Sequence, residues 1–113
     1  MNNGNNIENR GDIVNCANNL DKTTIVINVL CAHLGIDAIE INEKLKKKEN
    51  KYIFLLLLKN YKCLDKEKVK EMLEVISDKS INYNINKAQE KLLVNKEFRE
   101  MYFKIEEGLN KII

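Results

Sequence analysis

A chain of 113 residues is long enough for one modest hydrophobic core and too short for several domains. A 44% hydrophobic and 32% charged composition excludes a disordered chain, and the absence of proline with only four glycines favours an all-α fold over a β-rich one. The net charge of +2 excludes a strong overall attraction to nucleic acid, so any nucleic-acid surface must be local.

The N-terminal region predicts a tail and one short helix. Residues 1–10 are polar and rich in asparagine, which is typical of a flexible tail, so a single domain is expected over 11–113. A short helix is expected over Asp12–Leu20. The apolar residues expected on its inward side are Ile13, Val14 and Ala17.

Two further helices are expected before residue 46. The first has Asp21 as its N-cap and ends at Gly35, which can adopt the left-handed conformation. The residues at helical spacing on its inward side are Ile25, Val29, Ala32 and His33, and a lone histidine beside an apolar face is usually a packing residue. The second helix is short and capped by Asp37. Its apolar residues are Ile39, Ile41 and Leu45.

The most basic stretch of the sequence is 44–51, which we call the basic segment. Only Glu43, just before it, and Glu49 oppose its lysines, which are Lys44, Lys46, Lys47, Lys48 and Lys51. Clustered lysines release counterions when they meet a nucleic-acid backbone, so this segment can bind phosphates. The same composition also fits a solvated linker between two helices, and the pattern alone does not choose between them.

The second half of the chain contains two strongly apolar patterns. Tyr52–Tyr61, YIFLLLLKNY, is apolar on nearly all sides, which is typical of a helix at the centre of a fold. Residues 95–113 predict a terminal helix with Asn95 as its N-cap. We expect its apolar stripe to pack on the central helix or on a partner such as a second copy. The stripe consists of Phe98, Met101, Tyr102, Ile105 and Leu109.

Residues 65–93 lie between these patterns and predict a helix-turn-helix. The first helix carries Val69, Met72 and Leu73 on one face, and the second carries Ile81, Ile85, Ala88 and Leu92. The turn between them is Glu74–Asp78, in which Ser77 and Asp78 can each cap the following helix. The same pattern also fits any pair of amphipathic helices in an all-α protein.

The outward residues of the second helix suit a DNA-recognition helix. Lysine binds phosphate, and asparagine can form two hydrogen bonds with the edge of an adenine. The expected base contacts are Asn82, Tyr83 and Asn86. The expected phosphate contacts are Lys79 and Lys87, together with Lys46, Lys47, Lys48 and Lys51 of the basic segment.

From about Ile25 to Leu109 the order of these pieces resembles the C-terminal DNA-binding domain of the bacterial replication initiator DnaA. The segment TTIVINVLCAHLGIDAIEINEKLKKKENK is similar to that domain's first helices and basic loop. YIFLLLLKNYKCLDKEKVKEML is similar to its long helix and the first helix of its hairpin, and SDKSINYNINKAQEKLL to its recognition helix. The resemblance implies a Trp-repressor-like helix-turn-helix bundle of about six helices that binds double-stranded DNA.

The signature motif of that family is Asp-His-Thr-Thr-Val at the start of the recognition helix. It falls here on Ser77, Asp78, Lys79, Ser80 and Ile81, of which only the last two are chemically similar. The resemblance therefore implies DNA contacts from Asp78, Lys79 and Ser80 without the family's target sequence. The chain has no glycine-rich phosphate loop and so lacks the ATPase part of an initiator.

The leading hypothesis is a non-enzymatic DNA-binding protein of the bacterial cytoplasm that regulates or assists replication or transcription. The alternative is a module of the same fold that has lost DNA binding and instead binds a protein or dimerises. An enzyme is disfavoured because the sequence shows no nucleophile–base pair or paired carboxylates. Three separated cysteines and one histidine exclude a zinc site, no cofactor is expected, and Cys31 and Cys63 are expected to be buried, reduced thiols.

Overall fold

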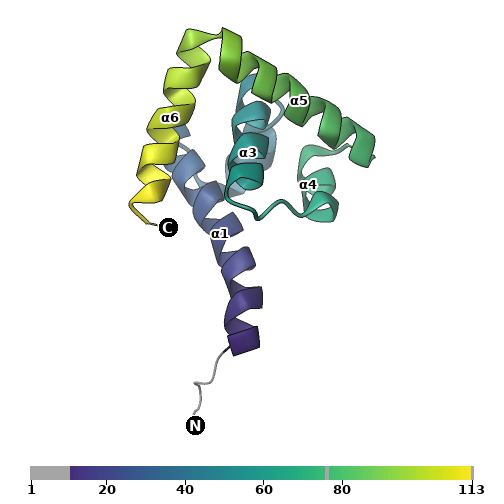
Figure 1. The fold of residues 1–113 in the computed structure, drawn as a ribbon, viewed down its shortest axis with the longest axis vertical. Coiled ribbons are helices and arrows are strands. Elements are labelled where there is room, and N and C mark those ends of the chain that lie inside the picture. Colours follow the sequence, from purple (N-terminus) through teal and green to yellow (C-terminus); the bar gives the residue numbers. More distant parts are fainter. Residues whose placement is uncertain (1–10, 76, 113) are drawn as a thin grey trace.

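The computed structural model describes residues 11–75 and 77–112, with side chains from residue 22 onward. All regular structure in this part of the chain is helical, which confirms the expected all-α class with six α-helices (Figure 1). The elements are α1 (Gly11–Leu34), the 3-10 helix η1 (Ala38–Glu40), α2 (Ile41–Lys44), α3 (Lys48–Asn60), α4 (Lys66–Leu73), α5 (Asp78–Val94) and α6 (Lys96–Asn110).

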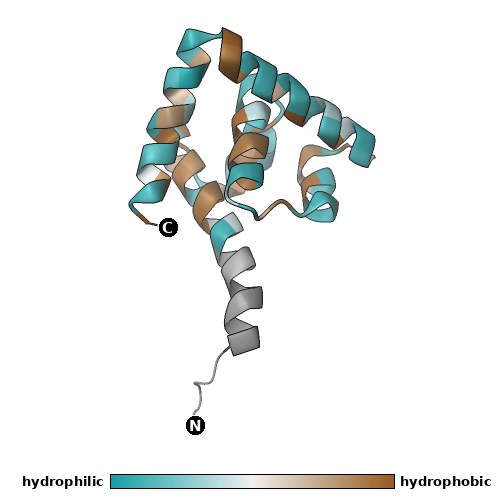
Figure 2. Ribbon diagram, viewed as in Figure 1, coloured by the Kyte–Doolittle hydropathy of each residue, from teal (hydrophilic) through white to brown (hydrophobic). Residues whose placement is uncertain are grey.

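Helix α3 lies at the centre of the fold. All seven residues from Tyr52 to Leu58 are buried, which confirms the expected central helix. A helix that is apolar on every side must be covered on every side, and α1, α5 and α6 all pack against α3. In Figure 2 hydrophobic residues follow α1 and α3 at the centre, and α5 and α6 are mostly hydrophilic apart from a hydrophobic turn where the two helices meet.

Helix α1 differs from the expectation in two ways. It is one continuous helix rather than two, so Asp21 lies inside it and is not an N-cap. Its buried residues are Val26, Leu30 and Cys31, whereas Ala32 and His33, expected to face inward, are exposed. The face was misassigned because the run from Ile25 to Cys31 is apolar at nearly every position, so its periodicity is weak.

Most residues named in the predictions for the N-terminal region lie outside the described part of the structure. The predicted tail, 1–10, lies outside the described residues, as do the side chains of Ile13, Val14 and Ala17. For the remainder of α1, the side chains half-buried against the core include Ile25, Ile27, Val29 and Leu34. The packing of α1 is therefore described from residue 22 onward.

Three helices end with a residue in the left-handed conformation. Gly35 has φ +70° as expected, and the N–H of Ile36 donates to the carbonyl of Cys31, which closes the end of α1. Lys62 after α3 and Glu74 after α4 also adopt the left-handed conformation, with φ +59° and +57°. These two residues are not glycines, so neither turn could be predicted from its residue type.

The segment between α1 and α3 confirms some expectations and corrects others. The N–H of Asp37 donates to the carboxylate of Glu40 at 3.0 Å, which ties together the start of η1. Ile41 and Leu45 are buried as expected, but Ile39 is 89% exposed. The inward assignment of Ile39 is wrong because a 3-10 turn, with a different period, precedes α2.

Polar side chains cap helices α4, α5 and α6. The apolar side chains that these helices turn inward are largely those expected. Asp65 accepts hydrogen bonds from the N–H groups of Glu67 and Lys68 at the start of α4, and Asn95 accepts one from Phe98 at the start of α6. Val69 of α4 is buried, and Met72 and Leu73 pack against the core. In α5 the inward residues are Ile81, Ile85, Ala88 and Leu92.

Helix α6 packs its apolar stripe on the protein's own core. Phe98, Tyr102, Ile105 and Leu109 are buried and Met101 is half-buried. Asn60 donates to the hydroxyl of Tyr102, and Tyr61 donates to the side-chain oxygen of Asn110 at 2.6 Å. Burial raises the pKa of Tyr102 to about 12. This stripe is therefore covered within the chain itself.

Cys31 and Cys63 are buried free thiols, as expected. Burial is the main cause that raises the pKa of each thiol above its ordinary value. No single helix in the described residues is long and apolar enough to cross a membrane. Only the segments 22–34 and 38–44 together reach that length and hydropathy, and they meet at a bend of 91°.

Replacing Ile81 with alanine should reduce the free energy of unfolding by about 2–5 kcal/mol, because this side chain of α5 is fully buried in the core. The same change at Ile39 should alter it by no more than about 0.5 kcal/mol, because that side chain is exposed. Urea denaturation of both variants measures the difference. Equal losses in the two variants would contradict the described core.

Candidate nucleic-acid interface

Helix α5 presents a polar face to solvent because its opposite face is fixed against the core. Ser77 caps it by accepting a hydrogen bond from the N–H of Ser80 at 3.1 Å. Ile81, Ile85 and Ala88 are buried at helical spacing. Since the helix has one buried face, residues about half a turn away must face outward.

The residues that the sequence predicted to contact bases and phosphates lie on this outward face. Lys79, Asn82, Tyr83, Asn86 and Lys87 are all exposed, and we call them the outer face of α5. Tyr83 is 60% exposed. The ammonium of Lys87 lies 5.7 Å from the centre of the Tyr83 ring and 3.5 Å from the carboxylate of Glu90.

Ser80 has a different environment from these neighbours. It is half-buried, and its hydroxyl accepts a hydrogen bond from the hydroxyl of Ser77 at 3.1 Å. The carbonyl of Ser80 accepts a hydrogen bond from the amide of Asn84. Ser80 therefore belongs to the cap of α5, while its side chain still lines an open groove. This groove is lined by Ser77, Lys79, Ser80, Tyr83 and Asn84.

Asp78 is the one acidic residue among the expected DNA contacts, and an ion pair opposes its charge. The ammonium of Lys70 on α4 lies 3.0 Å from the Asp78 carboxylate and 2.9 Å from that of Glu67. The hydrogen bond from Lys70 holds the pKa of Asp78 below its ordinary value. The pair joins α4 to α5 and offsets a negative charge at the start of α5.

The basic segment is partly helical rather than a linker throughout. Helix α3 begins at Lys48, so Lys48 and Lys51 belong to its first turn, and Lys51 is half-buried. Lys46 and Lys47 precede the helix and are exposed, as is Lys48. The buried amide of Asn50 donates to the carbonyl of Lys44 at 3.0 Å, which holds the two ends of the segment together.

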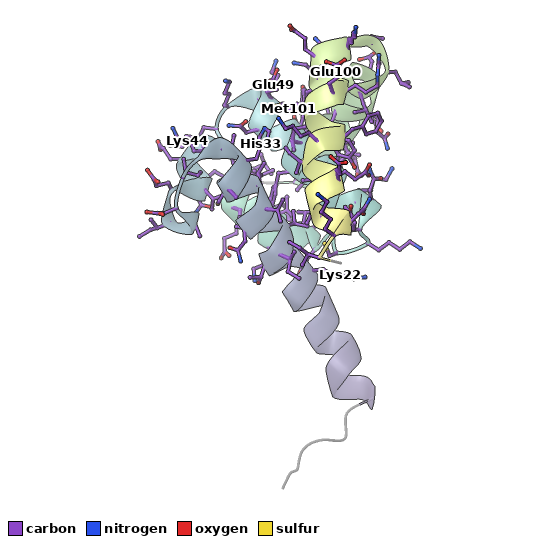
Figure 3. The ribbon with its side chains drawn as sticks, turned by 90° about the vertical axis from the view of Figure 1, so that its left-hand side faces the viewer. Lys22, His33, Lys44, Glu49, Glu100 and Met101 are labelled. Atoms are coloured by element: carbon purple, nitrogen blue, oxygen red, sulfur yellow. The ribbon has the colours of Figure 1, made fainter. Side chains whose placement is uncertain are left out.

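The structure brings the basic segment into contact with α5. The carboxylate of Glu49 lies 3.5 Å from the ammonium of Lys91 on α5. Lys46 forms an ion pair with Glu43 at 3.1 Å, and the hydrogen bond with Glu43 is the main cause that raises the pKa of Lys46. The ion pair between Glu49 and Lys91 therefore places the basic segment beside α5. Figure 3 shows Lys44 and Glu49 at the end of the molecule away from the N-terminus of α1.

Sequence reasoning missed three residues that organise this surface. Lys70 and Lys91 form ion pairs between elements, and Asn50 closes the basic segment. Lys91 also lies 5.3 Å from the centre of the Phe98 ring on α6. A helical-period count could have found Lys91, because it follows Lys87 by four residues, but the partners of Lys70 and Asn50 required the tertiary structure.

No protein-family model matches the chain, and neither a curated protein nor a solved structure does. The function of this surface must therefore be inferred from its residues. Its described chemistry consists of exposed ammonium, amide and phenol groups on α5, with further exposed ammonium groups on the adjacent basic segment.

Replacing Asp78 with asparagine should destabilise the protein at neutral pH, because it removes the ion pair between α4 and α5. The pKa of Asp78 is lowered by folding, so its contribution is present above the ordinary aspartate value near 3.8 and is lost as the pH falls below it. Denaturation curves of the two proteins from pH 7 down to pH 2, taken at about one-unit steps, measure this difference.

Glu67→Gln is the matched control for that experiment. It removes the other carboxylate from Lys70 but leaves the contact between the helices intact, so it should cost less stability than Asp78→Asn. A gap between wild type and Asp78→Asn that is unchanged at the lowest pH would contradict the assigned ion pair.

Proposed function

We propose that this protein is a non-enzymatic, double-stranded DNA-binding protein in which α5 enters the major groove. The observation that carries the proposal is the position of α5. One face is packed on α3, and the other presents Lys79, Asn82, Tyr83, Asn86 and Lys87 to solvent. Lysine suits phosphate and asparagine suits a base edge, so this face contains the groups needed for both kinds of contact.

The dimensions of α4 and α5 also support the proposal. Helix α4 has 8 residues and α5 has 17, and residues 74–77 join them. A short helix, a turn of about four residues and a longer helix are the parts of a DNA-binding helix-turn-helix, in which the second helix lies in the major groove. Helix α5 is long enough to cross a groove with its outer face exposed.

Local charge supports a phosphate contact by the basic segment. In the described part of the chain, Lys47 and Lys48 form no ion pair, and neither does Lys79 at the start of α5. The charge of Asp78 is offset by Lys70. The net charge of +2 is small, so binding would depend on this local group of lysines.

The resemblance to the DNA-binding domain of DnaA adds a biological role to the proposal. A DNA-binding domain of this kind would regulate or assist replication or transcription in the cytoplasm. In that role the basic segment would bind the DNA backbone beside the groove that α5 occupies. Lys79 in place of the family's neutral threonine would change the target sequence.

A second candidate function is protein binding or dimerisation by a module that no longer touches DNA. The observation that favours it is the exposure of large apolar side chains at the junction of α5 and α6 and in the middle of α6. Leu93 and Val94 are each 78% exposed, and Phe103 on α6 is 51% exposed. The buried stripe of α6 does not contribute to this candidate, because it packs on the core.

DNA binding should depend steeply on salt if several lysines contact phosphates. The logarithm of the association constant should fall by about one unit per phosphate contact for each tenfold rise in salt concentration. Gel-shift titrations of a mixed-sequence duplex at several salt concentrations measure this slope. Binding that does not change with salt, or no binding at micromolar protein, would count against the proposal.

Replacing both Lys47 and Lys48 with glutamate should weaken DNA binding by at least about tenfold, because it removes two phosphate contacts and adds repulsion. The matched control reverses the charge of Lys104 on α6 and of Lys111 just after it, which are also exposed. Both double variants have the same net charge. If the two bind DNA equally well, the basic segment has no specific role and the protein-binding candidate gains support.

A further inference from the structure

The outer face of α5 divides into two rows of different chemistry. The first follows steps of four residues and consists of three lysines, Lys79, Lys87 and Lys91, with Tyr83 between the first two. We call it the cation row. The second, the amide row, follows steps of four and three and consists of Asn82, Asn86 and Gln89. Residues at these spacings lie one above another on a helix, so the two rows run side by side along α5.

The cation row lies on the side of α5 that meets the basic segment. Its last member, Lys91, forms the ion pair with Glu49 at 3.5 Å. Within the row, Lys87 is held over the ring of Tyr83. The row therefore adjoins the basic segment at Lys91, and the amide row lies on the other side of the outer face.

The amide row has no hydrogen-bond partner in the described part of the protein. Asn82 and Asn86 are exposed and Gln89 is half-buried, and none of the three forms a hydrogen bond with another described residue. The other asparagines from residue 50 onward all do. These are Asn50, Asn60, Asn84, Asn95 and Asn110. Asn28 on α1 and Asn42 on α2 are also exposed without such a partner, so three of the five unpaired amides with described side chains lie on α5, the surface proposed to meet DNA.

We infer that the amide row selects adenine-containing sites, while the cation row follows the phosphates of the adjacent strand. This inference rests on the DNA-binding function proposed above and adds Gln89 as a specificity-determining residue. Both Asn and Gln can form two hydrogen bonds with the N6 and N7 atoms of adenine in the major groove. Each amide has the donor and the acceptor that this edge requires.

The spacing of the row sets the length of the site. Along the helix axis Asn82 and Gln89 are separated by about 10.5 Å, with Asn86 about 6 Å from Asn82. Three base-pair steps of a DNA duplex span about 10 Å. The preferred adenines should therefore fall within a window of about four consecutive base pairs, and the two asparagines should read positions about two base pairs apart.

Selection of bound duplexes from a random-sequence library tests the inference. The wild-type protein should enrich sites with adenines in such a window and prefer them about tenfold or more over sites with a substitution at one of those positions. A triple variant, Asn82→Ala, Asn86→Ala and Gln89→Ala, should lose that preference. It should keep its salt-dependent binding to mixed-sequence DNA, which also shows that the variant folds.

A variant of the cation row is the matched control. Lys79→Ala with Lys87→Ala should weaken binding to all sequences and keep the adenine preference, because phosphate contacts position the protein without reading sequence. If wild-type protein binds no duplex, the proposed function and this inference both fail. If it binds without an adenine preference, or the triple variant keeps the preference, the inference alone is overturned.

Discussion

The fold depends on the complete burial of α3. Seven consecutive buried residues leave no side of this helix compatible with solvent, so other elements must cover it all round. Helix α5 covers one side, and this contact determines which of its residues face inward. The exposed chemistry of α5 is therefore a consequence of the core: the residues that bind α3 leave the lysines and amides on the opposite side.

Much of the architecture follows from local sequence patterns. The central helix, the inward faces of α5 and α6, and the caps at Ser77 and Asn95 were predictable, because helical periodicity and capping chemistry act over a few residues. The orientation of α1 was not predictable, because its apolar run lacks a clear period. The turns at Lys62 and Glu74 were not predictable either, since neither residue favours the left-handed conformation.

In the candidate site, too, some features could be predicted from local sequence and others depend on how the helices pack. The exposed members of α5 could be predicted by counting half a turn from the buried residues, without knowledge of the partner helix. The helical half of the basic segment could not, because lysines at 48 and 51 fit a loop as well as a first helical turn. The ion pairs of Lys70 and Lys91 join residues from different elements, so they depend on how the helices pack.

Few buried side chains hold the short helix α4 to the rest of the protein. Val69 is its one fully buried residue, and left-handed residues flank it at Lys62 and Glu74, each costing about 1 kcal/mol. Amide hydrogens of α4 should consequently exchange with solvent through local opening, well before global unfolding. Each such opening separates Lys70 from Asp78 and leaves a carboxylate uncompensated at the start of α5. The electrostatic potential of that helix end would thus fluctuate with the opening and closing of its neighbour.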